Sequence, residues 1–332
     1  MPVIERSTYE APLLLWNGHL QTVLPTLFRR VPAVRYRRVR VETPDGDFLD
    51  VDWADVPHAR GICIVSHGLE GNSDGKYIRG MVRALNADGW TAVAWNYRGC
   101  SGEPNRLLRA YHSGASDDLE VVVQHVLHAV PEVPLSLVGF SLGGNLTLKY
   151  LGERGARVHP RLWRAVTFSA PCHLAASSIQ IGRHWLYMSR FLISLRRKIR
   201  AKMKTHPGEI DDRGYHRLRN FKHFDDRYTA PLNGFRDAED YWARASSKPY
   251  LPAIRVPALL INAWNDPFLT WECFPIAEAR ESPWFYLEAP LSGGHVGFVS
   301  FNKQGRYWSE QRTVEFLRQA LPSRAATDLR TG

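Results

Sequence analysis

The sequence predicts an α/β fold in which a mostly parallel sheet of about eight strands is flanked by helices and interrupted by a mainly helical cap. Two observations predict it. Short runs rich in β-branched and aromatic residues alternate with helical stretches over residues 61–170, as in successive βαβ units. The alternation stops near residue 173 and resumes at residue 258. A chain of 332 residues, 44% hydrophobic and 23% charged, is long enough to bury such a core.

The expected elements follow in order along the chain. Residues 34–53 alternate around the turn Pro44-Asp45-Gly46, which predicts two antiparallel strands. Strands of the parallel part are expected at residues 61–67, 91–97, 135–140, 165–170, 258–263 and 284–289. Helices are expected near residues 77–87, 117–130, 142–152, 272–280 and 307–320. The predicted domains are a first part of the core at 1–172, a helical cap at 173–250, a second part of the core at 251–322 and a tail at 323–332.

Most of the excess positive charge lies in one segment of the predicted cap. The formal net charge of the chain is +10, and residues 183–222 hold twelve basic and three acidic residues. Apolar residues recur in this segment every three or four positions, which predicts a basic amphipathic helix. These residues are Met188, Leu192, Leu195, Ile199 and Met203.

Three interpretations of this helix are open. In the first, the apolar stripe packs on the body of the protein and the charges are merely solvated. In the second, the helix is a lid whose basic face meets acidic substrates or makes peripheral contact with an anionic membrane through residues 183–222. The third is nucleic-acid binding, and we expect no such partner because no DNA- or RNA-binding module accompanies the charge.

The cysteines and the N-terminal residues bound the cellular setting. The four cysteines are far apart and form no C-x-x-C pair, so we expect reduced thiols, no metal and no other cofactor; they are Cys63, Cys100, Cys172 and Cys273. Residues 1–16 lack a basic region before their short apolar run, and no apolar stretch approaches the ~18 residues of a membrane span. We expect a cytoplasmic protein, with peripheral membrane contact as the alternative.

A candidate nucleophile follows the predicted strand at 135–140. Gly139-Phe140-Ser141-Leu142-Gly143 is a G-x-S-x-G sequence between a strand and a helix, where the serine sits on a sharp turn and the glycines leave room for the chain to reverse. The hydroxyl of Ser141 then lies at a helix N-terminus, where partial positive charge favours a developing anion.

A serine nucleophile needs a base and an orienting acid, expected downstream in the order serine, acid, histidine. His295 is the only histidine after residue 266, and it lies in a loop directly after the predicted strand at 284–289. Asp266 directly follows another strand, whereas the later glutamates lie in or beside a helix or within a strand. Because the carboxyl ends of parallel strands share one sheet edge, Asp266 and His295 are the predicted partners of Ser141.

The predicted oxyanion hole consists of two backbone N–H groups. One belongs to Leu142, the residue after the nucleophile. The other is expected from Leu69, in the loop His67-Gly68-Leu69-Glu70-Gly71 that follows the strand at 61–67. His67 precedes the serine in the chain, so we interpret it as a structural, hydrogen-bonding residue.

At these positions the chain resembles the α/β-hydrolase superfamily, and within it the YheT-like branch of cap-bearing proteins. The matching blocks are NGHLQT (17–22), HGLEGN (67–72), NYRGCSGEPNR (96–106), YHSG (111–114), GFSLGGN (139–145), FDDRYTAPLNGFRDAEDYW (224–242), NDPF (265–268) and GGHVGF (293–298). The resemblance implies an α/β-hydrolase fold, an ester substrate, and Ser141, Asp266 and His295 as a catalytic triad. Relatives often carry a second aspartate where this chain has Asn265, which leaves Asp266 as the sole acid in that turn.

Charged residues in the same blocks receive structural interpretations. We expect Arg98 and Glu103 to form an ion pair within their loop. Asp225 and Asp226 are expected to brace the junction between cap and core.

The function expected from these residues is that of a serine hydrolase. It would cleave carboxylic esters of short to medium acyl chains, in a small or lipid-like substrate, through an acyl-enzyme on Ser141. One alternative keeps the triad but resolves the acyl-enzyme with an alcohol, which makes the protein an acyltransferase or ester synthase. The other is a non-catalytic protein that binds a membrane surface through its basic segment.

Overall fold

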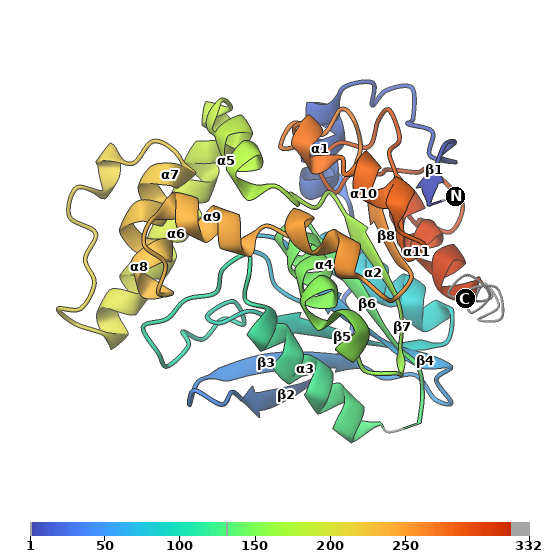
Figure 1. Ribbon diagram of the computed structural model, residues 1–332, viewed down its shortest axis with the longest axis horizontal. Helices are drawn as coiled ribbons and strands as arrows, with labels where there is room; N and C mark the ends of the chain where they lie inside the picture. The colour runs from blue at the N-terminus through green and yellow to red at the C-terminus, as the bar shows by residue number, and fades with distance from the viewer. Residues whose placement is uncertain (1, 131, 320–332) are drawn as a thin grey trace, which may run out of the picture.

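A computed structural model describes residues 2–130 and 132–319. Their centre is a nine-stranded sheet with the strand order β1-β9-β8-β7-β6-β4-β5-β3-β2 (Figure 1). The strands are β1 (Val3–Ile4), β2 (Arg37–Glu42), β3 (Phe48–Ala54), β4 (Gly61–Ser66), β5 (Trp90–Asn96), β6 (Leu135–Phe140), β7 (Leu162–Phe168), β8 (Ala258–Ile261) and β9 (Phe285–Glu288). Only the pairs β2–β3 and β3–β5 are antiparallel, which confirms the predicted mostly parallel sheet. The ninth strand is β1, whose two residues pair with β9 and carry no periodic pattern.

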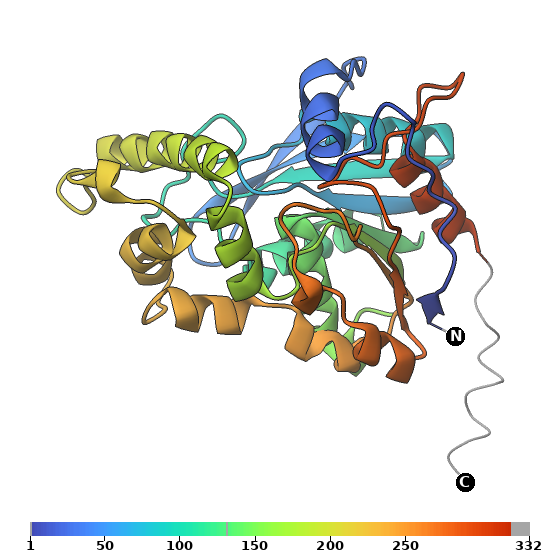
Figure 2. The same cartoon turned by 90° about the horizontal axis from the view of Figure 1, so that it is seen from above.

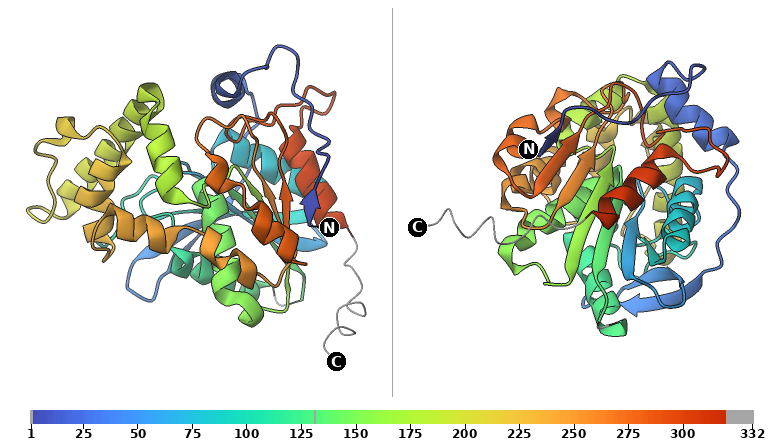
Figure 3. Two further views of the ribbon diagram at one scale, coloured as in Figure 1. Left: turned by 45° about the horizontal axis from the view of Figure 1, so that its top comes forward. Right: turned by 90° about the vertical axis from the view of Figure 1, so that its right-hand side faces the viewer.

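Helices cover both faces of the sheet, and Figure 3 shows the cyan α2 (Lys76–Ala87) and the red α11 (Trp308–Arg318) together on one of them. Side chains alternate between the two faces because successive residues of a strand point in opposite directions. Ile62 and Ile64 of β4 pack in one hydrophobic cluster with α3 (Ser116–Ala129) and α4 (Leu142–Arg154). Cys63 and Val65 pack on the other side with α2 and α11. This double cover explains why every residue of β4 is buried.

The segment between β7 and β8 is mainly helical and has a hydrophobic cluster of its own. Its longer helices are α5 (Leu174–Gly182), α6 (Trp185–Thr205) and α9 (Ala238–Ala245), and the short ones are α7 (Phe221–Phe224) and α8 (Ala230–Leu232). In Figure 1 these helices form the left-hand side of the molecule, beside the sheet. We call this segment the cap. Its limits at 173 and 250 stay a prediction, and the predicted tail at 323–332 lies outside the described residues.

Helix α6 is the basic amphipathic helix that the sequence predicts. Met188, Leu192, Leu195 and Ile199 are buried, while Met203 is partly exposed. Two lysines of the same helix, Lys198 and Lys202, also turn toward the core, since they lie three and four positions from the buried residues. Among the described residues, no helix has both the length and the apolar character needed to cross a membrane.

The remaining helices complete the arrangement around the carboxyl edge of the sheet. Helix α1 (Gly18–Phe28) precedes β2, and α10 (Ile276–Glu281) lies between β8 and β9. Gly18 at the start of α1 packs so closely on the loop after β8 that a Cβ there would lie 1.9 Å from the carbonyl oxygen of Asn265. This contact brings the start of α1 to the edge of the sheet where the parallel strands end.

Candidate active site

The turn between β6 and α4 places Ser141 in a strained backbone conformation. Its φ of 53° lies in the left-handed region, which a residue with a side chain rarely adopts. A Cβ at Gly139 would lie 2.3 Å from the carbonyl oxygen of Gly143, and a Cβ at Gly143 would lie 2.5 Å from that of Ser66. Both glycines are therefore required by close backbone contacts, and the turn holds the Ser141 hydroxyl beyond the end of β6.

The structure brings the three predicted triad residues together. The Nε2 atom of His295 lies 2.9 Å from the Oγ atom of Ser141. On the other side of the ring, Nδ1 lies 2.8 Å from Oδ2 and 3.1 Å from Oδ1 of Asp266. A carboxylate only accepts hydrogen bonds, so Nδ1 donates to Asp266 and Nε2 is left to accept the proton of the Ser141 hydroxyl.

Burial and backbone contacts fix the carboxylate of Asp266. Its side chain is 0% exposed, and its Oδ1 accepts a 2.8 Å hydrogen bond from the backbone N–H of Phe268. The ring of Phe268 packs against the ring of His295, with 4.3 Å between centroids. The imidazole is thus held between Asp266 and the ring of Phe268.

The predicted oxyanion donors are Leu142, the first residue of α4, and Leu69, in the loop after β4. A Cβ at Gly68 would lie 3.2 Å from the Cβ of Ser141, so the backbone before Leu69 runs directly beside the nucleophile. The N–H of Gly68 donates to the Tyr77 hydroxyl at 2.9 Å, which fixes this backbone. Across residues 2–130 and 132–319, no hydrogen-bond acceptor meets the N–H of Leu69 or Leu142. Both residues line the same cavity as Ser141 and His295.

His67 has the structural role that the sequence predicts. Its Nδ1 donates to the carbonyl oxygen of Gly68 at 2.7 Å, and its Nε2 accepts from the backbone N–H of Tyr97 at 3.4 Å. Burial disfavours the charged imidazolium and lowers the pKa of His67 to about 3. Both ring nitrogens are therefore occupied within the core, away from Ser141.

Helix α1 braces the loop that carries His295, which the sequence did not reveal. The buried Gln21 accepts hydrogen bonds from the Asn265 side chain at 3.1 Å and from the N–H of Gly293 at 2.7 Å. Thr22 accepts from the N–H of His295 at 2.8 Å. Asn265 also accepts from the N–H of Gly294 at 3.0 Å. The sequence signal for these residues was the block at 17–22, which matches the YheT-like branch. The contacts of Gln21 and Thr22 show that this block braces the loop that carries His295.

Glu70, the residue after the predicted oxyanion donor Leu69, forms polar contacts with the cap. Glu70 has a φ of 57°, and its carboxylate accepts 2.6 Å hydrogen bonds from the hydroxyls of Tyr111 and Ser194. The ammonium group of Lys198 lies 3.5 Å from the same carboxylate. Ser194 and Lys198 both belong to α6, so the cap and the loop at 67–71 are joined beside Leu69.

A second lysine of α6 ties the cap to the loop after β5. Lys202 donates to the carbonyl oxygens of Leu107 and Arg109. Burial lowers its pKa to about 8. The spacing of Lys198 and Lys202 within the apolar stripe of α6 was the sequence signal for these inward-facing lysines.

The expected ion pair between Arg98 and Glu103 is wrong. Arg98 instead pairs with Asp118 at 2.6 Å and with Asp45 and Asp47 at 2.9 and 3.0 Å, and Glu103 pairs with Arg40. The physical reason is that the fold brings two buried carboxylates to Arg98, Asp47 from the turn between β2 and β3 and Asp118 from α3, and buried carboxylates need a cation to balance them.

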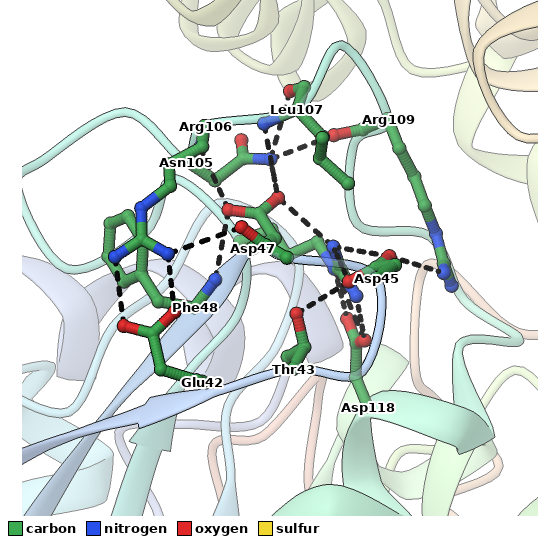
Figure 4. A network of polar contacts seen from close by, with 12 residues as sticks. Glu42, Thr43, Asp45, Asp47, Phe48, Asn105, Arg106, Leu107, Arg109 and Asp118 are labelled. Atoms are coloured by element: carbon green, nitrogen blue, oxygen red, sulfur yellow. Dashed lines mark hydrogen bonds and ion pairs between the residues drawn. The ribbon is translucent and has the colours of Figure 1, made fainter.

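Figure 4 shows how this network holds the loop after β5. Asp47 accepts hydrogen bonds from the backbone N–H of Arg106 at 2.8 Å and from the side chain of Asn105. Burial alone would raise the pKa of Asp47, but these hydrogen bonds and the charge of Arg98 hold it below its usual range. These contacts fix the loop at 98–109, and the part of it between residues 98 and 105 contributes to the wall of the cavity.

The interpretation of Asp225 and Asp226 as braces between cap and core is also wrong. Asp225 accepts from the Trp242 indole at 2.8 Å and from the Thr229 hydroxyl at 2.6 Å, and Asp226 accepts from the N–H of Ala238 at 2.8 Å. All of these partners lie within the cap, because the two carboxylates follow α7 directly and face its neighbour α9. They stabilise the cap internally.

A cavity of ≈ 270 Å³ lies between the cap and the carboxyl edge of the sheet. Ser141 and His295 form part of its wall, together with Leu69 and Leu142. Much of the remaining wall is apolar and comes from the cap, namely Leu174, Ile181, Phe191, Leu195, Phe221 and Trp242. Ser141 therefore lies at the wall of a largely apolar cavity.

Comparisons with known proteins agree with this architecture. The family described as "Serine aminopeptidase, S33" matches residues 57–270. YheT of Escherichia coli (strain K12) is 35% identical over 317 residues, which cover 93% of this chain and 92% of YheT. "Phospholipase ABHD3" of Mus musculus is 31% identical over 309 residues, which cover 90% of this chain and 74% of that protein. The chain belongs to the α/β-hydrolase superfamily, in the branch that contains YheT.

Solved structures show the same fold. An esterase of Pyrococcus furiosus superposes with a TM-score of 0.58 at 18% identity, covering 87% of this chain and 97% of that one. The acylaminoacyl peptidase of Pyrococcus horikoshii also gives a TM-score of 0.58, at 15% identity, covering 90% of this chain and 43% of that one. At these identities the likeness concerns the fold alone.

Proposed function

We propose that the protein is a serine carboxylesterase acting through Ser141, Asp266 and His295. The observation that carries this is the continuous hydrogen-bonded series from Asp266 through His295 to Ser141, with distances of 2.8 and 2.9 Å, at the wall of an apolar cavity. A free serine hydroxyl is a poor nucleophile, and this arrangement is the standard means of activating it. "Phospholipase ABHD3" and a "Monoacylglycerol lipase" of Saccharomyces cerevisiae are among the relatives, which supports an ester substrate.

In the proposed reaction, Nε2 of His295 accepts the Ser141 proton as Oγ attacks the acyl carbonyl carbon. The oxygen of the tetrahedral intermediate accepts hydrogen bonds from the N–H groups of Leu69 and Leu142. His295 then protonates the leaving alcohol, and a water molecule, deprotonated by His295, cleaves the acyl-enzyme. Every group in these steps belongs to the chain, apart from substrate and water.

The volume of the cavity supports the proposal that the acyl chains are short to medium in length. Its ≈ 270 Å³ lies just below the ~300–1,000 Å³ typical of small-molecule sites. We expect p-nitrophenyl esters to be cleaved with a kcat/KM that rises with acyl length and then falls when the chain exceeds the cavity. The acyl-chain series should be run beside Ser141→Ala, with Ser178→Ala as the matched control, because Ser178 lines the same cavity. Full activity of Ser141→Ala would overturn the proposal.

Alcohol transfer is the second candidate, and the apolar wall of the cavity favours it because such a wall lowers the amount of water near the acyl-enzyme. The two reactions share every catalytic group. They are separated by the product ratio of acid to ethyl ester when ethanol is added during turnover. An ester fraction of zero at high ethanol would reject alcohol transfer.

A further inference from the structure

We propose that the start of α6 and the loop before α1 together form a docking surface for an anionic lipid membrane. The surface has an apolar rim, consisting of Leu13, Leu14, Trp16, Trp185 and Leu186, and a basic flank, consisting of Arg190, Arg197 and Lys204. The rim is contributed by residues 13–16 and the start of α6, which are far apart in the sequence and adjacent in the fold.

The large apolar side chains of the rim are strongly exposed, and exposed apolar side chains that gather on one part of a surface mark an interaction site. Leu13 and Leu14 are 96% and 82% exposed, and Trp16 is 75% exposed. Trp185 and Leu186, at the start of α6, are 76% and 61% exposed. Tryptophan and leucine are the residues with which peripheral proteins enter the boundary between lipid headgroups and acyl chains.

Aromatic contacts join the two segments of the rim. His19, near the start of α1, stacks on Tyr187 of α6 with 5.8 Å between ring centroids, and its Nδ1 lies 3.1 Å from the Tyr187 hydroxyl. His184, just before α6, packs edge-to-face on the same histidine at 5.1 Å. Figure 2 shows the yellow-green α6 beginning beside the blue α1 and running away from it. Trp16 and Trp185 therefore flank one junction.

The basic flank makes the surface complementary to anionic lipid. Helix α6 contains no aspartate or glutamate. Arg190, Arg197 and Lys204 are exposed, and within the described parts of the chain no carboxylate pairs with them. Two other arginines of α6 are compensated, since Arg196 and Arg200 both pair with Asp212 at 3.0 and 2.8 Å. On α6, the exposed cations without a carboxylate partner therefore share the helix face that carries Leu186, next to Trp185 at the start of the helix.

The rim lies close to the proposed active site, so docking on a membrane would bring Ser141 near lipid substrates. The ring of Tyr187 packs on Phe268 at 4.8 Å, and Phe268 packs on His295 at 4.3 Å. Only two aromatic rings separate the rim from the proposed catalytic base. A membrane seated on the rim would hold an ester of its own lipids next to the cavity.

Sedimentation with vesicles tests the proposal without turnover, so a failure of the proposed esterase activity would leave this test intact. We expect binding to vesicles of phosphatidylcholine and phosphatidylglycerol, and little binding to phosphatidylcholine alone. The triple variant Arg190→Gln, Arg197→Gln, Lys204→Gln should weaken this binding about hundredfold at low salt, since each basic residue contributes about fivefold. Added salt should weaken binding of the unaltered protein as well.

Matched variants separate docking from damage to the fold. Arg83→Gln removes one charge from an exposed arginine of α2 and should bind the vesicles like the unaltered protein. The pair Trp185→Ser, Leu186→Ser should lose binding, whereas Trp185→Phe should keep it, and all should hydrolyse a soluble ester alike. Equal binding to both vesicle types, or unchanged binding of the triple variant, would overturn the proposal. A dimer that depends on the rim residues in sedimentation would also overturn it. So would binding to DNA that stays stronger than binding to vesicles after Trp185 is replaced.

Discussion

The loops at the carboxyl edge of the sheet and the helical cap are held in place by different means. Backbone constraint positions Ser141, through its φ of 53° and the close approach of Gly139 to Gly143. The cap is held by side chains, such as the Trp242 indole on Asp225 and the ammonium group of Lys198 beside Glu70. The difference shows that the nucleophile rests on backbone geometry that local sequence encodes, whereas the cap is held by contacts between side chains.

The largest expected effect distinguishes two histidines of the core. His295→Gln should lower kcat about 10⁴-fold or more, because the general base is lost, while the free energy of unfolding changes little. His67→Gln should instead lower the stability, because the buried contacts of His67 with Gly68 and Tyr97 are lost. Ester turnover and urea unfolding of both variants measure the contrast.

The assignment of the two histidines would be reversed by the opposite pattern. His295→Gln would then unfold readily but retain kcat, and His67→Gln would remain stable and inactive. Circular dichroism at the assay temperature shows whether each variant is folded when its activity is measured.

The second prediction concerns acid stability of the core. The native pKa of His67 is lowered to about 3, and burial gives His112 the same value. The unfolded chain protonates these rings as the pH falls through ~6.5, whereas the native protein does not until about 3. Each histidine therefore contributes stability that is lost between these values, up to roughly 5 kcal/mol. Urea unfolding at several pH values measures this slope, and no loss of stability between pH 6 and 4 would contradict it.

The cap should respond to pH in the opposite direction. Burial raises the native pKa of Asp225 to about 7, whereas the unfolded carboxyl ionises near 3.8. The native state binds the extra proton between these values, so the contribution of Asp225 is fully present at low pH and is lost as the pH rises. The loss is on the order of 4 kcal/mol.

Hydrogen exchange of cap peptides measures this trend when it is corrected for intrinsic exchange. Protection of α9 should fall between pH 4 and 7, and Asp225→Asn should remove the dependence while keeping an acceptor for Trp242. An unaltered pH dependence in Asp225→Asn would assign the effect to another group.

A smaller effect tests the link between the two regions. Lys198→Met should lower kcat about tenfold with little change in KM, because the Glu70 carboxylate loses a charge partner beside the N–H of Leu69. Lys198→Arg should restore most of kcat. Lys204→Met, on the exposed face of the same helix, is the matched control for soluble esters. Equal loss of stability and activity in both Lys198 variants would show a purely structural role.

Much of the site was accessible from the sequence for a physical reason. The turn around Ser141 needs glycines at fixed positions, and the strand pattern predicts which loops share an edge with it. His295 was found by elimination because no other histidine follows residue 266. The parallel core was predicted from its alternating elements, apart from β1, whose two residues are too few to form a pattern.

The remaining contacts could not be predicted because they depend on packing between distant segments. Gln21 and the N–H of Gly293 are 272 positions apart, and nothing near either residue indicates the other. Arg98 was assigned to Glu103 in its own loop, but the fold offered it buried carboxylates at Asp47 and Asp118. A charged side chain pairs with the opposite charges that the fold places near it, and a single sequence does not specify these neighbours.

Identification of the residue that reacts with a fluorophosphonate tests the central claim most directly. We expect mass spectrometry of the digested protein to show one adduct, on the peptide that contains Ser141, formed far more slowly in His295→Gln. An adduct on a different residue, or equal labelling of Ser141→Ala, would contradict the account.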